Sequence, residues 1–275
     1  MELTFEKYEG LGNDFLVVDD PGAGARVDRA LAVRLCDRHR GVGGDGVLVV
    51  LGDRERPSMR VFNADGSVPE MCGNGIRCVG LHLVRRGRAR IGEPLAIDTD
   101  AGEHRVLVHE AGDEGQVEVW MRAPSLEPAD LPLRSERRWV SEPIEVVGRL
   151  VRVTAVSMGN PHAVLFDEDG ERAVLGPALE VDPRFPERVN VGFAASSERG
   201  LELAVWERGV GWTMACGTGA CAAAVAAVET GRAQRGRPLA VHLPGGPLSI
   251  VVGAEGEPVR MTGPARHVFT GRVTL

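Results

Sequence analysis

The segment EMCGNGIRC, Glu70–Cys78, places a cysteine directly before a glycine-rich turn, and a near copy, MACGTGACA, returns at Met214–Ala222. After each cysteine the apolar spacing predicts a helix, over residues 73–86 and 217–229, and a glycine follows each helix as its stop. The duplicated context indicates that the chain builds one kind of cysteine site twice.

The repeat extends beyond the two cysteines. Short apolar strands and helices follow in the same order in both halves of the sequence, and matching landmarks lie about 144 to 147 residues apart. These pairs are Gly12-Asn13 with Gly159-Asn160, Asp45 with Asn190, Asn63 with Glu207, and Cys72 with Cys216. We therefore predict an α/β fold of two pseudo-symmetric halves, each a mixed sheet curled round a central helix, with the active site in the cleft between them.

Cys72 and Cys216 are the candidate reactive residues. A cysteine just before a helix lies beside unpaired backbone N–H groups and the positive end of the helix dipole, which favour the thiolate. The glycines that follow let a ligand approach the backbone, and the same N–H groups can bind a carboxylate. The other three cysteines, Cys36, Cys78 and Cys221, lack this context and are read as small buried side chains.

Two such sites, placed on opposite faces of one carbon, have a defined chemical use. A thiolate on one face removes a proton, and a thiol on the other face delivers one, so that the stereocentre is inverted. The α-proton of an amino acid is very weakly acidic, so the charge that develops on the carboxylate must be stabilised, which two helix N-termini can do. The pattern favours a racemase or epimerase.

Composition excludes several other classes. The net charge is −7, no basic run occurs and there is a single tyrosine, so we expect no nucleic-acid partner. No apolar run is long enough to span a bilayer, and the N-terminal residues do not resemble a signal peptide, so we expect no membrane association and a cytoplasmic location. Five cysteines without a metal-ligand spacing predict free thiols and no metal site.

Asparagine is rare in the chain, and its five positions are therefore informative. Each side chain offers both donors and an acceptor, and the alternative role of asparagine is to form turns and caps. The five residues all fall close to the duplicated landmarks: Asn13, Asn63, Asn74, Asn160 and Asn190.

Five segments resemble the signature segments of the diaminopimelate epimerase family: GLGNDFLVVD (10–19), NADGSVPEMCGNGIRC (63–78), MGNPH (158–162), RVNVGF (188–193) and ERGVGWTMACGTGACA (207–222). Proline racemases and phenazine-pathway isomerases share the layout of two sites but do not have these motifs. The resemblance implies a cofactor-independent interconversion of LL- and meso-2,6-diaminopimelate, in lysine and peptidoglycan precursor synthesis. It also implies an N-terminal half over residues 1–117, to which 264–275 return as a last strand, and a C-terminal half over 118–263.

The resemblance also implies roles for individual residues. Cys72 is the proton donor and Cys216 the acceptor in the LL-to-meso direction. Glu207 pairs with a substrate ammonium, and His162 and Glu207 adjust the pKa values of the two thiols. A homodimer through Phe269 is compatible with the family. The residues expected to bind the substrate are Asn13, Asn63, Gly73, Asn74, Asn160, Asn190, Glu207, Arg208, Gly217 and Thr218.

Two alternatives stay open at the level of sequence. One is an isomerase of the same fold that acts on proline-like amino acids, which a screen of substrates would distinguish. The other is a thiol redox or amino-acid-binding protein without turnover, which would handle its ligand normally after Cys72 or Cys216 is replaced by alanine.

Overall fold

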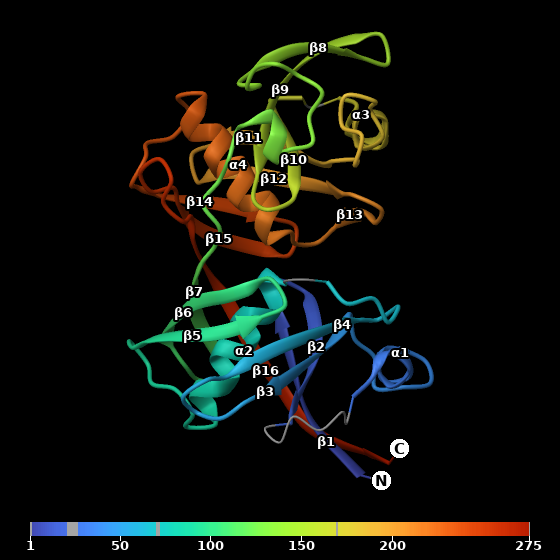
Figure 1. Cartoon of the computed structure of the whole chain (residues 1–275), viewed down its shortest axis with the longest axis vertical. Helices are drawn as coiled ribbons and strands as arrows, with labels where there is room; N and C mark the ends of the chain where they lie inside the picture. The colour runs from blue at the N-terminus through green and yellow to red at the C-terminus, as the bar shows by residue number, and fades with distance from the viewer. Residues whose placement is uncertain (1, 21–26, 70–71, 169, 275) are drawn as a thin grey trace. The chain divides into compact units, whose positions relative to one another are not determined.

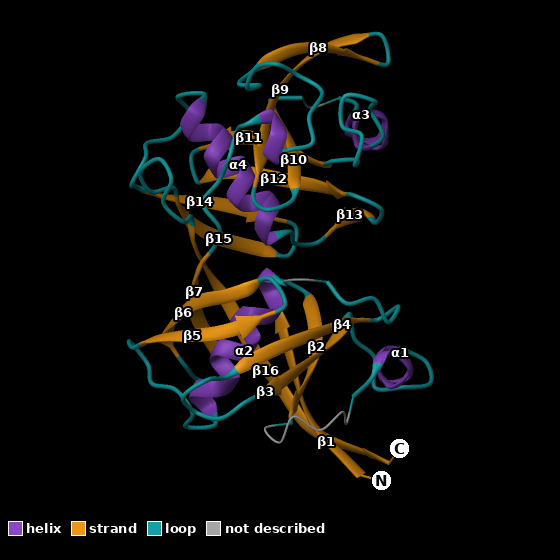
Figure 2. Cartoon of the chain, in the orientation of Figure 1, coloured by secondary structure: helices purple, strands orange, loops and turns teal. Residues whose placement is uncertain are grey.

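The computed structural model describes residues 2–20, 27–69, 72–168 and 170–274 (Figure 1). The chain divides into two compact units: an N-terminal unit of residues 1–119 with 262–275, and a C-terminal unit of residues 120–261. Each unit contains one long helix among its strands (Figure 2).

The N-terminal unit is a mixed sheet that closes on itself. Strand β16 hydrogen-bonds with β7 on one side and pairs antiparallel with β1 on the other, from Glu2 opposite Thr274 to Glu9 opposite Arg266. The pairs β2–β3 and β4–β5 are parallel. In order round the barrel the strands are β1 (Glu2–Gly10), β2 (Asn13–Asp19), β3 (Gly46–Leu51), β4 (Ser58–Asn63), β5 (Pro94–Thr99), β6 (Gly102–Glu110), β7 (Glu114–Trp120) and β16 (Arg260–Thr274).

Helix α2 (Gly73–Arg85) lies inside this barrel, where it contacts β1, β2, β3, β4 and β6. Its apolar side chains Ile76, Val79, Leu81 and Leu83 are fully buried. Burial of each stabilises the fold by about 1.5–3 kcal/mol, so the barrel holds the helix along its whole length. The prediction of a helix over 73–86 is confirmed.

The outer face of the same sheet is covered by a second helix, α1 (Arg29–Cys36). Asp28 caps it by accepting a hydrogen bond from the N–H of Leu31 at 2.8 Å. Alternation along the strands places Leu16 and Val18 against α1 and leaves Phe15 and Val17 for the inner face. Both faces of the sheet are therefore buried, and for this reason its strands read as continuous apolar runs.

The C-terminal unit repeats this plan. Helix α4 (Gly217–Glu229) contacts β9, β10, β11, β12, β14 and β15, and helix α3 (Arg172–Glu180) packs its Leu175 and Leu179 on the other face. The alanines of α4 are fully buried, and their small size lets the helix lie close to the strands. The sheet order is β15 (Gly246–Val251), β14 (Pro238–Leu243), β12 (Gly200–Glu207), β11 (Asn190–Ser197), β10 (Pro161–Phe166), β9 (Arg149–Ser157) and β8 (Glu142–Val146). Strand β13 (Gly211–Thr213) pairs with β12, and a short 3-10 helix spans Pro128–Asp130.

The structure adds strands that the sequence pattern did not predict. β1 and β8 have charged residues among their apolar ones, and β13 has only three residues, so none forms an apolar run. The two strands predicted near 259–262 and 268–275 are one long strand, β16, because its middle residues continue the pairing with β1.

Gly80 marks a point where α2 passes close to the barrel wall. A Cβ atom at this position would lie 2.8 Å from Cγ1 of Val106 on β6. Alanine normally stabilises a helix interior by roughly 1 kcal/mol over glycine. We expect Gly80→Ala instead to lower the free energy of unfolding by about 1–3 kcal/mol, because the β-branched side chain of Val106 cannot move aside.

Denaturant unfolding would measure this change. The double variant Gly80→Ala/Val106→Ala should lose less stability than the two single losses added together. A Gly80→Ala protein as stable as the wild type would contradict the packing described for α2.

Candidate active site

Both candidate thiols are N-cap residues of the central helices. Cys72 precedes α2, and its Sγ accepts a hydrogen bond from the N–H of Gly75 at 3.3 Å. Cys216 precedes α4, and its Sγ lies 3.6 Å from Oγ1 of Thr218. The two helix N-termini therefore carry one thiol each, next to backbone N–H groups that have no partner within the helix.

The second glycine of each Cys-Gly-x-Gly segment makes room for the thiol. A Cβ atom at Gly75 would lie 3.3 Å from Sγ of Cys72, and one at Gly219 would lie 3.2 Å from Sγ of Cys216. These distances are shorter than the ordinary van der Waals contacts of a β-carbon. A side chain at either glycine would press on the sulfur, which gives the repeated glycine a structural reason.

In the N-terminal unit a row of hydrogen bonds runs from the first turn of α2 to the start of β3. Arg77 Nη2 donates to Oδ1 of Asn74 at 2.9 Å, and Nδ2 of Asn74 donates to Oδ1 of Asn13 at 3.3 Å. Nδ2 of Asn13 then donates to Oδ2 of Asp45 at 2.6 Å. A guanidinium can only donate and an ionised carboxylate can only accept, so the two ends fix the orientation of both amides.

The two ends of this row are themselves held. Arg77 is fully buried, and it also donates to the backbone carbonyls of Gly73 at 3.2 Å and Pro264 at 3.1 Å. Asp45 accepts from Arg38 Nη2 at 2.8 Å. The structure therefore brings Asn13 and Asn74 together beside Cys72 in a rigid arrangement.

Asn63 lies at the neighbouring strand end. It is the last residue of β4 and pairs in register with Gly46, the residue after Asp45. Its Nδ2 donates to Oγ of Ser67 at 2.9 Å, across the turn that follows the strand. Asn63 therefore shares the edge of the sheet with Asn13, but its amide is held by its own turn.

The C-terminal unit places the equivalent residues in the same way. Asn160 Nδ2 donates to Oγ1 of Thr218 at 3.4 Å, and Oδ1 of Asn160 lies 3.0 Å from Nε2 of His162. By the sequence repeat, Asn160 matches Asn13 and Thr218 matches Asn74, so matching residues are hydrogen-bonded in both units, although the helix residue donates in the N-terminal unit and accepts in the C-terminal unit. This contact ties the loop before β10 to the helix that follows Cys216.

Asn190 and Arg208 complete this set. Asn190 pairs in register with His162 on the adjacent parallel strand, and its Nδ2 donates to the carbonyl of Pro161 at 2.9 Å. Its Oδ1 accepts from the backbone N–H of Arg208 at 3.0 Å, while Nη1 of Arg208 donates to the carbonyl of Glu187 at 2.9 Å. Asn190 is buried, so its amide serves the backbone of the site.

Glu207 makes the surroundings of Cys216 acidic. Burial raises the pKa of Glu207, although hydrogen bonds from Thr213 and Cys216 oppose the shift. Thr213 Oγ1 donates to Oε1 of Glu207 at 2.6 Å. Burial, reinforced by the charge of Glu207, also raises the pKa of the Cys216 thiol well above its ordinary value. Hydrogen bonds from Thr218 and Gly219 oppose this shift, so at Cys216 burial acts against the thiolate that a helix N-terminus favours.

His162 is neutral in this structure. Burial, with a smaller effect of the Arg208 charge, lowers the pKa of His162 to about 3. Near pH 7 the imidazole of His162 is therefore uncharged and can act as a hydrogen-bonding partner. Asp45, Arg77 and Thr213, which support these side chains, were not predicted as site residues, although Arg77 and Thr213 lie within the recognised motifs and Asp45 is a landmark of the repeat.

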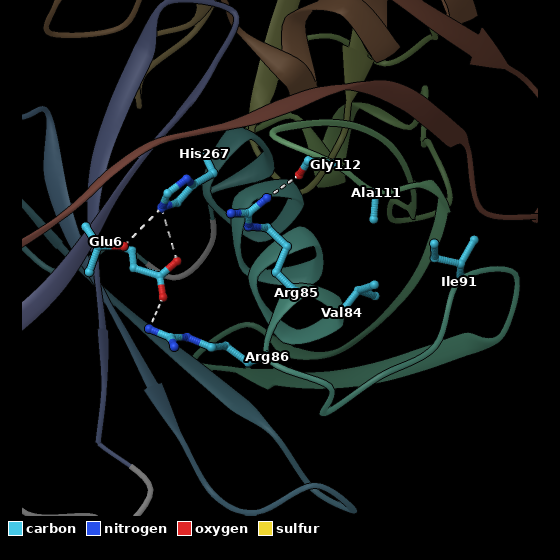
Figure 3. Close-up of a pocket in the computed structure, with 9 residues that line it drawn as sticks. Glu6, Val84, Arg85, Arg86, Ile91, Ala111, Gly112 and His267 are labelled. Atoms are coloured by element: carbon cyan, nitrogen blue, oxygen red, sulfur yellow. Dashed lines mark hydrogen bonds and ion pairs between the residues drawn. The ribbon is translucent and has the colours of Figure 1, made fainter.

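A pocket of about 570 Å³ lies elsewhere in the N-terminal unit, near the C-terminal end of α2 (Figure 3). None of the predicted site residues lines it. Arg85 and Arg86 reach into it from the helix end, and Arg86 and His267 pair with the buried carboxylate of Glu6. Arg85 donates to the carbonyl of Gly112. The charged side chains that line this pocket are thus paired within the protein.

Within the described ranges, no group of three or more His, Cys, Asp or Glu side chains is arranged to hold a metal ion. The same part of the chain contains no helix with the length and apolar content needed to cross a membrane.

Comparison with known proteins identifies the relatives of this chain. The family model described as diaminopimelate epimerase matches residues 5–126 and 154–268. Proteins named diaminopimelate epimerase from Stutzerimonas stutzeri and Ectopseudomonas mendocina are 45% and 46% identical, with both chains covered completely. One from a Nostoc species, named diaminopimelate epimerase 1, is 44% identical over 99% of this chain and all of the relative.

Solved structures with low sequence identity share the fold. A Bacillus anthracis phenazine biosynthesis protein of the PhzF family aligns with a TM-score of 0.74 at 18% identity, over the full length of both chains. A hydroxyproline epimerase from Agrobacterium vitis aligns with a TM-score of 0.67 at 15% identity, over 100% of this chain and 93% of that one. The predicted fold class is confirmed by these comparisons together with the observed sheets.

The coupling between Glu207 and Cys216 gives a testable pH dependence. Glu207→Gln removes a negative charge that helps to raise the pKa of the Cys216 thiol. We expect the rate of alkylation of Cys216 by iodoacetamide to rise at lower pH in the variant than in the wild type, because the thiolate forms more readily. Mass spectrometry of the Cys216 peptide across a pH series would measure the shift.

Glu202→Gln, on the same strand, is the matched control, because Glu202 pairs with Arg199 at the surface. Its profile should follow that of the wild type. An unchanged profile in Glu207→Gln, or one moved to higher pH, would contradict the electrostatic role of Glu207.

Glu6 in the pocket gives a second prediction, for stability. Burial opposes its ionisation, but His82, Tyr8 and Arg86 outweigh burial and lower the pKa of Glu6 to about 2 from the ordinary 4.5. Because the pKa of Glu6 is lower in the folded than in the unfolded protein, its ionisation stabilises the fold at pH values above about 4.5. This stabilisation is lost as the pH falls from 4.5 toward 2. We expect Glu6→Gln to reduce this acid-dependent loss by about 3 kcal/mol, measured by denaturant unfolding at several pH values.

The exposed Glu2, on the same strand, serves as the control, and Glu2→Gln should leave the acid dependence unchanged. The same acid dependence in Glu6→Gln as in the wild type would contradict the assignment. His82 cannot account for this loss, because its pKa is raised and its contribution is lost as pH increases.

Proposed function

The chain belongs to the diaminopimelate epimerase family, and we propose that it interconverts LL- and meso-2,6-diaminopimelate without a cofactor, as a step toward lysine and peptidoglycan precursors. The observation that carries this proposal is the pair of thiols that cap the central helices, Cys72 and Cys216, each beside a matching polar contact. Full-length identity of 43% to relatives of that name supports the choice of substrate.

The reaction that we propose moves one proton off the α-carbon and another onto its opposite face. In the LL-to-meso direction the thiolate of Cys216 takes the proton and the thiol of Cys72 supplies the new one, and the roles reverse in the meso-to-LL direction. The raised pKa of Cys216 suits this task, because its thiolate, once formed, is a strong base for a weakly acidic carbon. In its protonated resting state, Cys216 is ready to act as the donor of the meso-to-LL direction.

The helix N-termini would stabilise the charge that develops on the substrate carboxylate. Backbone N–H groups of Gly73 and Asn74, and those of Gly217 and Thr218, lie in the first turns of α2 and α4. Donors that are fixed before the reaction need no reorganisation when the enediolate-like charge forms, and removing one such donor typically costs about 10²- to 10³-fold in rate. The rigid first turns therefore favour a proton-transfer role over simple binding.

The remaining polar side chains would hold the rest of the substrate. Arg208 suits a bidentate grip on a carboxylate, and Glu207 suits an ammonium group. The amides that we assign to substrate binding are those of Asn13, Asn63, Asn160 and Asn190. Glu207 and the neutral His162 would adjust the pKa values of the two thiols.

We also propose a cytoplasmic homodimer. The five cysteines, which all lie among the described residues, are thiols, and a mechanism that needs two reduced thiols suits a reducing compartment. Phe269 is 45% exposed on β16 next to the half-exposed Val268, so this strand offers an apolar surface that a second copy could cover.

Separation of the LL and meso isomers by chiral chromatography tests the function. We expect the wild type to convert either isomer with no added cofactor or metal, and Cys72→Ala and Cys216→Ala each to lose at least about a thousandfold in kcat, because each removes one proton carrier. Cys78→Ala and Cys221→Ala are matched controls on the same helices and should keep activity.

Three outcomes would reject the proposal. One is a wild-type protein that leaves diaminopimelate unchanged but inverts proline, which would favour a proline-type isomerase. The second is inversion at the wild-type rate after either Cys72→Ala or Cys216→Ala. The third is ligand binding without turnover, which would favour a binding protein.

A further inference from the structure

Glu180 is a buried carboxylate whose two oxygens both accept hydrogen bonds. It is the last residue of α3, and only 7% of its surface is exposed. Oε2 accepts from the indole Nε1 of Trp206 at 2.7 Å. Oε1 accepts from the backbone N–H of Gly209 at 2.9 Å and from Nη1 of Arg188 at 3.4 Å. The carboxylate thus joins α3 to the end of β12 and to the turn beyond it.

This turn carries the two charged residues that we assign to the substrate site. β12 ends at Glu207, and Val210 N–H donates to the carbonyl of Glu207 at 3.0 Å to close the turn. Gly209 has a φ of +77°, which other residues adopt with strain. Two backbone N–H groups fix this turn from outside. That of Arg208 donates to the side chain of Asn190, and that of Gly209 donates to the side chain of Glu180.

Tight packing keeps the indole in place against α3. A Cβ atom at Gly176, one turn before Glu180, would lie 3.2 Å from the Cβ and Cγ of Trp206. The ring of Trp206 also meets that of Trp212 edge to face, with centroids 5.4 Å apart. The donor at Nε1 therefore has little freedom to turn away from Glu180.

We propose that Glu180 is a positioning residue for the proposed reaction: it holds the turn 207–210 so that Glu207 stays hydrogen-bonded to Cys216 and Arg208 stays in place for a substrate carboxylate. The inference rests on the proposed function and adds a residue that does not touch the substrate. The hydrogen bond from Trp206, aided by those from Gly209 and Arg188, lowers the pKa of Glu180, so the carboxylate is ionised near neutral pH.

Only a carboxylate can satisfy this arrangement. A glutamine at position 180 has one carbonyl oxygen and one NH₂ group, and donors lie on both sides of the side chain. In either orientation its NH₂ group meets an N–H donor, either that of Trp206 or those of Gly209 and Arg188. Removing the donor of Trp206 at the same time relieves the conflict, because the amide oxygen can then accept from Gly209 while its NH₂ faces a phenyl ring.

The test compares Glu180→Gln, Trp206→Phe and the double variant with the wild type, by steady-state kinetics on LL-diaminopimelate. We expect kcat/KM to fall by about 10- to 100-fold in Glu180→Gln, mainly through a higher KM, because Arg208 loses its position. Trp206→Phe should lose less than about threefold, and the double variant should recover to within about threefold of Trp206→Phe. Glu202→Gln, which removes an exposed carboxylate paired with Arg199 on the same strand as Trp206, is the matched control and should resemble the wild type.

Hydrogen exchange gives a second readout that does not depend on activity. Exchange of the amides of residues 207–211 should speed up in Glu180→Gln and return toward the wild-type rate in the double variant. Should Glu180→Gln be too unstable to purify, the double variant decides alone: it must fold and keep activity close to that of Trp206→Phe.

The outcomes separate this inference from the function itself. Absence of epimerase activity in the wild type overturns the proposed function. The hydrogen-exchange experiment then still tests whether Glu180 holds the turn 207–210. Normal kinetics in Glu180→Gln, or a double variant no better than Glu180→Gln, overturn the inference while the wild-type activity stands. A kcat/KM loss without faster exchange of the turn also overturns it.

Discussion

Each candidate thiol occupies the N-cap of a helix that its sheet surrounds, and the rest of the candidate site depends on this placement. Because α2 and α4 are in contact with strands on several sides, a shift of their first turns would disturb this buried packing. The glycine three residues after each cysteine leaves space for the sulfur, and a β-carbon at that glycine would press on it. A helix lying on an exposed face would give its N-cap far more freedom.

The two units repeat the geometry but differ in charge. Asn63 in the N-terminal unit matches Glu207 in the C-terminal unit, and Glu207 places a carboxylate in hydrogen-bond contact with Cys216. Asp45, which fixes Asn13, matches Asn190, which instead binds two backbone groups. Repetition thus supplies two similar sites, and the substitutions within it place an amide at one position and a carboxylate at the matching one.

Much of this arrangement could be predicted from sequence because the signals are local. The helices after Cys72 and Cys216 follow from periodicity and from the glycines that end them, and the repeat follows from counting residues. β1 and β13 could not be predicted, because one alternates charged with apolar residues and the other gains its stability from pairing with β12.

The supporting residues of the site were hidden for a different physical reason. Glu180 and Trp206 meet only after α3 folds over the sheet, so no spacing along the chain indicates their contact. The raised pKa of Cys216 could not be predicted either, because the position of a thiol at a helix N-terminus can be inferred from sequence but its burial cannot. The central claim is that two different groups carry the two protons. In D₂O, at early conversion of LL-diaminopimelate, the account predicts one deuterium on the inverted carbon of the meso product and almost none in the recovered LL substrate. Meso product without deuterium, or equal labelling of product and recovered substrate, would contradict it, because both results indicate a single base that serves both faces.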